Sequence, residues 1–261
     1  MTNVTDYPLL VFVLSFFALS LSAWIGKSFS KGQRAPEAEA REEFRVIEAA
    51  TLTLLALIVG FSFSMALNRY DQRKNYEEAE ANAIGTEYVR ADLLPAADAA
   101  KVRALLLNYL DERVLFYNAR GEQQVRQIDV QTAKLQAALW SAVQAPAVAQ
   151  PTPVIALAVG GMNDVLNSQG YTQAAWWNRI PIAAWGLMAA IAISCNVLVG
   201  FGARNAKAAP KMLLVLPLVV SIALFLIADI DSSRRGLIRM SPQNLLSLSQ
   251  SLHAHDWKTV N

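Results

Sequence analysis

Four stretches of this sequence constrain the fold more than any other feature, because each is nearly free of charge over about the 20 residues that a bilayer crossing needs. They cover residues 9–25, 47–67, 180–202 and 212–227. Hydrocarbon offers no partner for backbone amides, so such stretches are expected to form helices that satisfy their own hydrogen bonds. A water-soluble core rarely contains even one. We therefore expect an all-α membrane protein with four transmembrane helices.

Tryptophans at the ends of these stretches support their placement in a bilayer. Trp24 closes the first stretch, and Trp176 and Trp177 stand just before the third, as expected for aromatic anchors at the membrane interface. The first stretch could alternatively be a secretory signal. No Lys or Arg precedes Lys27, whereas a signal needs a basic start, so a retained membrane helix is the favoured interpretation.

The spacing of the four stretches predicts two helical hairpins on either side of an insert. We assign residues 1–67 to the first transmembrane hairpin, 68–179 to a soluble helical insert continuous with the second transmembrane helix, 180–230 to the second hairpin and 231–261 to a C-terminal tail. Within the insert, apolar residues recur at helical spacing over 75–94, 99–118 and about 122–145. Pro146, Pro151 and Pro153 indicate a loop after the third helix.

The composition limits the kinds of partner that this protein can bind. The net charge is only +2 and the basic residues form no stripe, which argues against nucleic acid. The single cysteine, Cys195, excludes an intrachain disulfide and a thiolate metal site. Lys and Arg are almost equally frequent on the two sides of the predicted membrane segments, so the positive-inside rule leaves the sidedness open. The lipid bilayer is the one partner that composition predicts.

No motif predicts catalysis. The chain has no glycine-rich phosphate loop, no His-Glu-x-x-His and no nucleophile elbow. We therefore expect no enzyme activity, no cofactor and no metal. His253, His255 and Asp256 have metal-binding side chains, but a solvated tail is the expected role for two histidines near the end of a chain.

Acidic residues occur in two places that require an interpretation. Glu77, Glu78, Glu80, Glu87 and Asp92 are expected to lie on a solvated helix face rather than in a cation site.

A second pair of acids, Asp229 and Asp231, closes the fourth hydrophobic stretch and is followed at once by Arg234 and Arg235. Carboxylates at the bilayer edge are costly unless they are paired or solvated, so we expect an ion-paired turn at the membrane interface.

The second hydrophobic stretch carries the most informative pattern. One stripe along it changes from apolar to polar, and it consists of Thr53, Leu57, Phe61, Ser64 and Asn68. Residues four apart drift by about 40° on a helix of 3.6 residues per turn, so these five share one face. The stripe has two possible roles: it packs on a neighbouring helix, or it lines a pore. In a pore, the apolar part would form a neck, and Arg69 and Arg73, which follow, would attract anions in a wider vestibule.

Two motifs resemble a known family. The run GFSFSMALNRYDQRKNYEEAEANAIGTEYVR at 60–90, with Ala91-Asp92-Leu93-Leu94-Pro95, is similar to the bacterial bestrophin-like family of unknown function. The closing stretch at 229–239, DIDSSRRGLIR, is also similar, although the family usually has a proline near Ser233. The resemblance in layout covers nearly the whole chain.

The family is distantly similar to the true bestrophins, which are pentameric anion channels. Gly60-Phe61 and Arg69-Tyr70 stand at the spacing of two bestrophin elements, and this implies that Thr53, Leu57 and Phe61 lie in the neck. Thr53 departs from the usual large apolar residue, and Tyr70 and Asp71 replace the tryptophans that follow the neck. The calcium-binding acidic cluster of animal bestrophins is reduced to Asp229 and Asp231, so calcium gating is not expected.

The resemblance implies a multi-pass protein of the bacterial inner membrane, with both termini and the insert in the cytoplasm. Our leading hypothesis is an oligomeric ion channel, pentameric if truly bestrophin-like, that passes small inorganic ions, with anions as the expected class. The alternative is a membrane-anchored helical scaffold or sensor without transport activity. The scaffold hypothesis predicts that the stripe is buried against another helix of the same chain.

Overall fold

A computed structural model describes residues 4–31, 38–203, 210–232 and 234–260. Ser233, at the position where the family usually has proline, lies outside the described residues. The described part of the chain contains helices and no strand. The predicted all-α class is confirmed.

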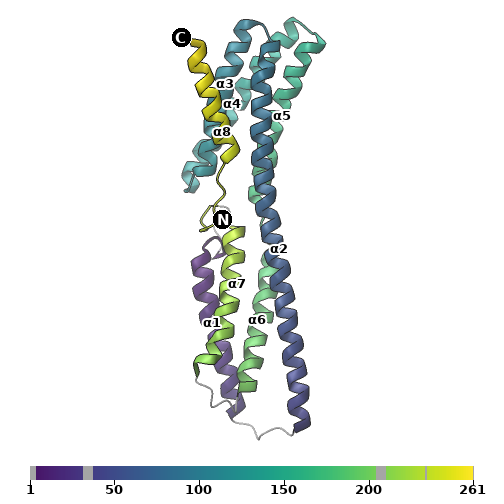
Figure 1. Cartoon of the computed structure of the whole chain (residues 1–261), viewed down its shortest axis with the longest axis vertical. Helices are drawn as coiled ribbons and strands as arrows, with labels where there is room; N and C mark the ends of the chain where they lie inside the picture. The colour runs from purple at the N-terminus through teal and green to yellow at the C-terminus, as the bar shows by residue number, and fades with distance from the viewer. Residues whose placement is uncertain (1–3, 32–37, 204–209, 233, 261) are drawn as a thin grey trace. The chain divides into compact units, whose positions relative to one another are not determined.

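The chain forms eight α-helices and three short 3₁₀ helices in its described part (Figure 1). In order they are η1 (Val4–Asp6), α1 (Pro8–Lys31), α2 (Ala38–Arg90), η2 (Ala91–Leu93), α3 (Ala96–Asn118), α4 (Glu122–Ala149), α5 (Pro153–Trp177), α6 (Ile182–Gly202), η4 (Pro210–Leu214), α7 (Val215–Asp231) and α8 (Gln243–Val260). Four apolar segments are long enough to cross a membrane, and they lie in α1, α2, α6 and α7. The four predicted transmembrane helices are therefore present.

The helices divide into two compact units. Unit 1 contains residues 1–69 and 179–239, and unit 2 contains residues 70–178 and 240–261. The helix α2 contributes its first part to unit 1 and its last part to unit 2. The segment 240–261, which contains α8, belongs to unit 2, whereas the sequence suggested a C-terminal tail over 231–261.

In unit 1, α1 packs against both α6 and α7. Two glycines allow the backbones of α1 and α6 to approach closely. A Cβ at Gly26 would collide with the carbonyl oxygen of Val197, and a Cβ at Gly200 would collide with that of Ala23. Small residues at a transmembrane interface permit this contact, because van der Waals packing replaces the missing hydrophobic driving force between helices in lipid.

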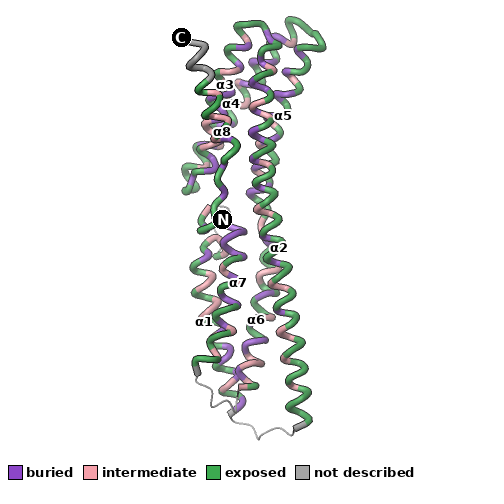
Figure 2. Tube along the Cα trace, viewed as in Figure 1, coloured by how far each residue is buried: buried purple, intermediate pink, exposed green. Residues whose placement is uncertain are grey.

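The first part of α2 contacts α6 at two levels. The Sγ of Cys195 donates a hydrogen bond to the carbonyl oxygen of Thr51 at 3.3 Å, and the rings of Phe44 and Phe201 lie 5.3 Å apart. Even so, only 11% of the most apolar 18-residue window of α2 is buried, against 28%, 22% and 44% for the other three spans. The α2 span is thus the one that its own chain covers least (Figure 2).

Unit 2 has its own hydrophobic core, to which the last part of α2, together with α3, α4, α5 and α8, contributes. Fully buried members include Ile84, Leu106, Tyr109, Phe116, Leu139, Val143, Met162 and Leu245. Three aromatic rings meet edge to face: Phe116, Tyr117 and Trp176 have centroids 5.2–5.6 Å apart. The insert therefore folds around apolar side chains from the helical periodicities seen in the sequence.

Two helix ends of unit 2 differ from or refine the sequence expectations. The helix α4 includes Pro146 and ends at Ala149, one turn beyond the predicted end near 145. The proline is tolerated because it is close to the last turn, where few helical hydrogen bonds remain to be lost. The helix α5 begins at Pro153, and the Thr152 hydroxyl caps it by accepting the amide hydrogen of Ile155 at 3.2 Å.

The helix α8 is anchored to unit 2 rather than solvated. The Glu77 carboxylate accepts the backbone N–H of Leu245 at 2.9 Å and the side-chain amide of Asn244 at 2.7 Å. A carboxylate at a helix N-terminus satisfies free N–H groups and complements the helix dipole. Farther along, Ser249 and His253 contact Asp111 of α3 at 3.2 and 3.3 Å. The side chains of His255 and Asp256 lie outside the described part of the structure.

Candidate functional site

The stripe on α2 is exposed along its whole length. Thr53, Leu57, Phe61, Ser64 and Asn68 are all exposed, with Leu57 at 51% and Phe61 at 62% of their full area. The Thr53 hydroxyl donates to the carbonyl oxygen of Ala49 at 2.9 Å, a bond within the helix that satisfies its polar group in an apolar setting. The stripe therefore presents apolar surface first and polar groups toward its C-terminal end.

The opposite face of α2 provides the packing in unit 1. Leu55, Ser62 and Ala66 are buried, and they stand about half a turn away from the stripe. A Cβ at Gly60 would meet no atom within 4 Å among the described residues, so this glycine serves no close contact within the chain. The scaffold hypothesis predicted burial of the stripe against the same chain, and the described helices do not provide it.

The two arginines assigned to a vestibule lie away from the stripe. The Nη1 of Arg69 is 3.6 Å from Oδ1 of Asp231, and the Arg69 side chain is only 14% exposed. Arg73 is buried at 3% exposure. A guanidinium that is buried or paired with a carboxylate is a weaker attractor for a passing anion than an exposed one. The sequence placed both arginines after the stripe but did not show which side of the helix each one occupies.

Other polar residues of α2 are exposed in unit 2. Asp71, Asn75, Glu78 and Asn82 are exposed, and their numbers continue the three-and-four spacing from Ser64 and Asn68. Lys74 is also exposed but falls off this spacing. The positions that continue the stripe by spacing thus carry two acids and no base.

At the end of α7, the two acids that the sequence assigned to an ion-paired interface turn are satisfied mainly by backbone groups. The Asp229 carboxylate accepts the N–H groups of Leu237 and Ile238 at 2.6 and 2.8 Å. Asp231 accepts the N–H of Ile180 at 3.3 Å and pairs with Arg69. Both acids are buried, so these bonds compensate for lost hydration. The turn thus connects the end of α7 to Arg69, within α2, and to Ile180, just before α6.

The arginines of the turn and one more ion pair complete this region. The Arg235 guanidinium lies over the ring of Tyr7 at 4.5 Å, a cation–π contact, and Arg234 is partly buried. Asp6 and Arg179 form an ion pair at 2.8 Å. Sequence reasoning did not identify Tyr7, Asp6 or Arg179, because their partners lie more than 170 residues away in the chain.

The expectation of a solvated acidic face on α2 is wrong for three of its members. Glu78 and Asp92 are exposed, but Glu77, Glu80 and Glu87 are buried. The burial is possible because long-range partners compensate two of the three charges. Glu77 caps α8, and Glu80 is paired with Arg113 of α3.

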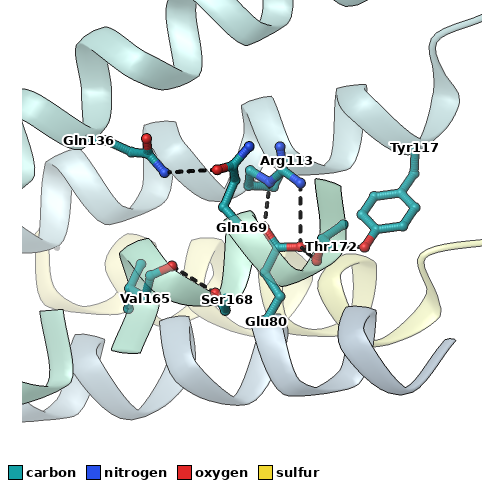
Figure 3. Close-up of polar contacts among 8 residues, drawn as sticks. All are labelled: Glu80, Arg113, Tyr117, Gln136, Val165, Ser168, Gln169 and Thr172. Atoms are coloured by element: carbon teal, nitrogen blue, oxygen red, sulfur yellow. Dashed lines mark hydrogen bonds and ion pairs between the residues drawn. The ribbon is translucent and has the colours of Figure 1, made fainter. Parts of the chain in front are cut away.

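The Glu80 carboxylate is the centre of a buried polar network in unit 2 (Figure 3). Arg113 donates from Nε to Oε1 and from Nη2 to Oε2, the latter at 3.5 Å. The hydroxyls of Thr172 and Tyr117 also donate to Oε2, at 3.0 and 3.4 Å. Burial by itself lowers the pKa of Arg113, but the Glu80 carboxylate outweighs this, so the net pKa of Arg113 is raised and its guanidinium stays protonated. Burial, reinforced by Glu80, raises the pKa of Tyr117, which stays a neutral donor.

Among the described residues, no group of three or more His, Cys, Asp or Glu side chains is arranged to hold a metal ion. The chemistry of the α2 stripe is that of a surface that contacts lipid, water, ions or another protein chain.

Comparison with known proteins agrees with this architecture. The sequence matches the bestrophin-like domain over residues 13–245. No curated protein matches the sequence.

Solved structures with the same fold include a bacterial bestrophin homologue from Klebsiella pneumoniae, which is 13% identical with a TM-score of 0.65 over 94% of this chain and 96% of that chain. A point variant of the Klebsiella pneumoniae homologue has 11% identity and a TM-score of 0.66 over 92% and 97% of the two chains. Another similar structure, described only as a membrane protein variant, has 14% identity and a TM-score of 0.62 over 92% and 95%. The match of this chain to the bestrophin-like domain covers most of its length and shows that the protein belongs to the bestrophin-like family of membrane proteins.

Proposed function

We propose that the protein is an oligomeric ion channel in which the α2 stripes of several copies surround a common axis. The observation that carries this proposal is the exposure of Thr53, Leu57, Phe61, Ser64 and Asn68 on the span that its own chain covers least. A polar stripe end facing lipid would be costly, whereas it is solvated in a water-filled pathway. Family membership supports the same role, and five copies are expected if the resemblance to true bestrophins extends to assembly.

The apolar part of the stripe would form the gate. A ring of Leu57 and Phe61 side chains makes a hydrophobic constriction, and such constrictions block ions by dewetting. Thr53 would make one end of the neck more polar, and Ser64 and Asn68 would rehydrate the ion at the other end. The neck thus controls flow by polarity and width, without a fixed binding site.

The charge of the permeant ion follows from what surrounds the pathway. The resemblance to bestrophins implied anions, with Arg69 and Arg73 expected to attract them, but one is paired with Asp231 and the other is buried. Of the four exposed positions that continue the spacing of the stripe, two are acidic, Asp71 and Glu78, and none is basic. Rings of acidic side chains favour cations. We therefore propose that this channel passes cations in preference to anions.

The test is ion flux through the purified protein in liposomes, with reversal potentials measured in a salt gradient. Phe61→Ala should raise the flux severalfold because it removes the largest side chain of the neck. Phe63→Ala is the matched control, since Phe63 lies on a different face of the same turn and should leave the flux unchanged. Glu78→Gln should move the reversal potential toward that of a non-selective pore. An absence of flux together with a monomeric mass would reject the channel and favour the scaffold.

We further propose that the protein lies in the bacterial inner membrane with both termini and residues 68–179 in the cytoplasm. A cysteine introduced at the exposed Ser141 of α4 should be protected from a membrane-impermeant thiol reagent in intact cells and labelled after lysis. Cys195 is buried and should remain silent in both cases. Labelling of Ser141→Cys in intact cells would reverse the proposed orientation.

A further inference from the structure

Glu87 differs from the other two buried acids of α2 in its hydrogen bonds. Glu77 caps α8 and Glu80 is paired with Arg113, but neither carboxyl oxygen of Glu87 has a hydrogen-bond partner in the described structure. The side chain is fully buried. It lies in unit 2, some 20 residues beyond the charge-free part of α2, so lipid does not account for its burial. An unpartnered buried carboxyl is costly when ionised and much less costly when protonated.

The site is shaped by a glycine of the neighbouring helix. A Cβ added to Gly161 of α5 would overlap Oε2 of Glu87 and crowd Nη1 of Arg90. The Glu87 carboxyl and the Arg90 guanidinium therefore converge on the same point of the α5 backbone. The contact between α2 and α5 at this level depends on the absence of a side chain at 161 and on the carboxyl that fills the space.

Two charged groups act on this contact: Arg90 belongs to α2 itself, and Asp164 lies one turn beyond Gly161 on α5. Arg103 of α3 contacts Asp92 and the carbonyl and ring of Tyr88 instead. Burial raises the pKa of Glu87 to about 8, with Arg90 acting to lower it and Asp164 to raise it. The group is thus neutral at neutral pH and ionises in mildly alkaline solution.

We propose that the protonation state of Glu87 controls the contact between α2 and α5. When protonated, the carboxyl occupies its site against Gly161 as a neutral group and the two helices stay in contact. When the proton leaves to water, a buried carboxylate remains that Arg90 compensates only in part, and α5 separates from α2 so that water can hydrate it. Because the pKa of Glu87 is raised from 4.5 to about 8 in the folded state, its contribution to stability is complete below about pH 4.5, falls as the pH rises toward 8, and is lost above that value.

The test is thermal unfolding of the purified full-length protein across about pH 4 to 10, combined with hydrogen exchange of α5. The wild type should lose thermal stability, and α5 should lose protection against exchange, in a step that begins near the ordinary pKa of 4.5 and ends near pH 8. Glu87→Gln, which is neutral at every pH, should lose that step. Glu78→Gln, an exposed acid on the same helix, should keep it.

Two further variants test the role of Glu87 if Glu87→Gln does not fold. Asp164→Asn removes a negative neighbour and should move the step to lower pH. Arg90→Gln removes a positive neighbour and should move it to higher pH. Persistence of the step in Glu87→Gln, or shifts of the two neighbour variants in the same direction, would overturn the proposal.

Discussion

The two parts of α2 differ in whether they bury polar or apolar side chains. In unit 1, the helix leaves Leu57 and Phe61 exposed and is the least covered of the four spans. In unit 2, the same helix buries Arg73, Glu77, Glu80 and Glu87. Hydropathy alone would suggest that the apolar side chains are buried and the charged side chains are exposed. The unit 2 part of α2 is thus buried by helices of its own chain, whereas the unit 1 part presents a surface that is left for lipid, water or another copy to cover.

The largest effect is expected where unit 2 compensates its buried charge. Glu80→Leu leaves the Arg113 guanidinium buried without its carboxylate, and removing one partner of a buried ion pair costs about 3–5 kcal/mol. Thermal or denaturant unfolding of the purified protein measures this loss. The double variant Glu80→Leu, Arg113→Leu should recover much of it, because no unpaired charge remains.

The control for this prediction is an exposed ion pair of the same unit. Arg126 and Glu122 lie 3.5 Å apart on α4 with both side chains more than half exposed. Glu122→Leu should leave the stability unchanged, because exposed pairs contribute little. Equal effects of Glu80→Leu and Glu122→Leu would mean that unit 2 does not depend on its buried charges.

An intermediate loss of stability is expected on the packed face of α2 in unit 1 and a smaller one on the stripe. Leu55 is 4% exposed and Leu57 is 51% exposed, so the two leucines differ in burial but not in chemistry. Leu55→Ala should destabilise the protein by about 2 kcal/mol, because it removes packed methyl groups and leaves a cavity. Leu57→Ala should cost much less if it lines a pathway. Equal losses in detergent unfolding experiments would indicate that copies pack tightly on the stripe and that it lines no pore.

The smallest effect is expected at the junction between α2 and α8. Glu77→Gln keeps the shape of the side chain but removes the charge that faces the N-terminus of α8, which is worth about 1 kcal/mol. The effect should be local: the amide of Leu245 should exchange its hydrogen faster, while the core amides of α3 stay protected. The neighbouring exposed Glu78→Gln provides the comparison and should change neither. Uniform loss of protection throughout unit 2 would contradict a local cap.

The extent of sequence-based prediction differs between elements for a physical reason. The spans in α1, α2, α6 and α7 were predictable because hydropathy and the need to satisfy backbone hydrogen bonds act within about 20 consecutive residues. The end of α4 was missed by one turn because a proline stops a helix only where its missing hydrogen bond matters. The helix α8 was missed because its stability comes from Glu77 and from α3, which are distant in sequence.

The sequence by itself determined the membrane character, the helical class and the position of the stripe from Thr53 to Asn68, since these follow from local polarity and a period of 3.6 residues. The covered face of α2 depends on tertiary contacts that the spacing does not show. These contacts place Arg69 beside Asp231, bury Arg73 and supply Arg113 to Glu80, but among the described residues they give Glu87 no hydrogen-bond partner. Burial and pairing depend on helices that meet after folding, and the spacing of residues along one helix carries no record of them.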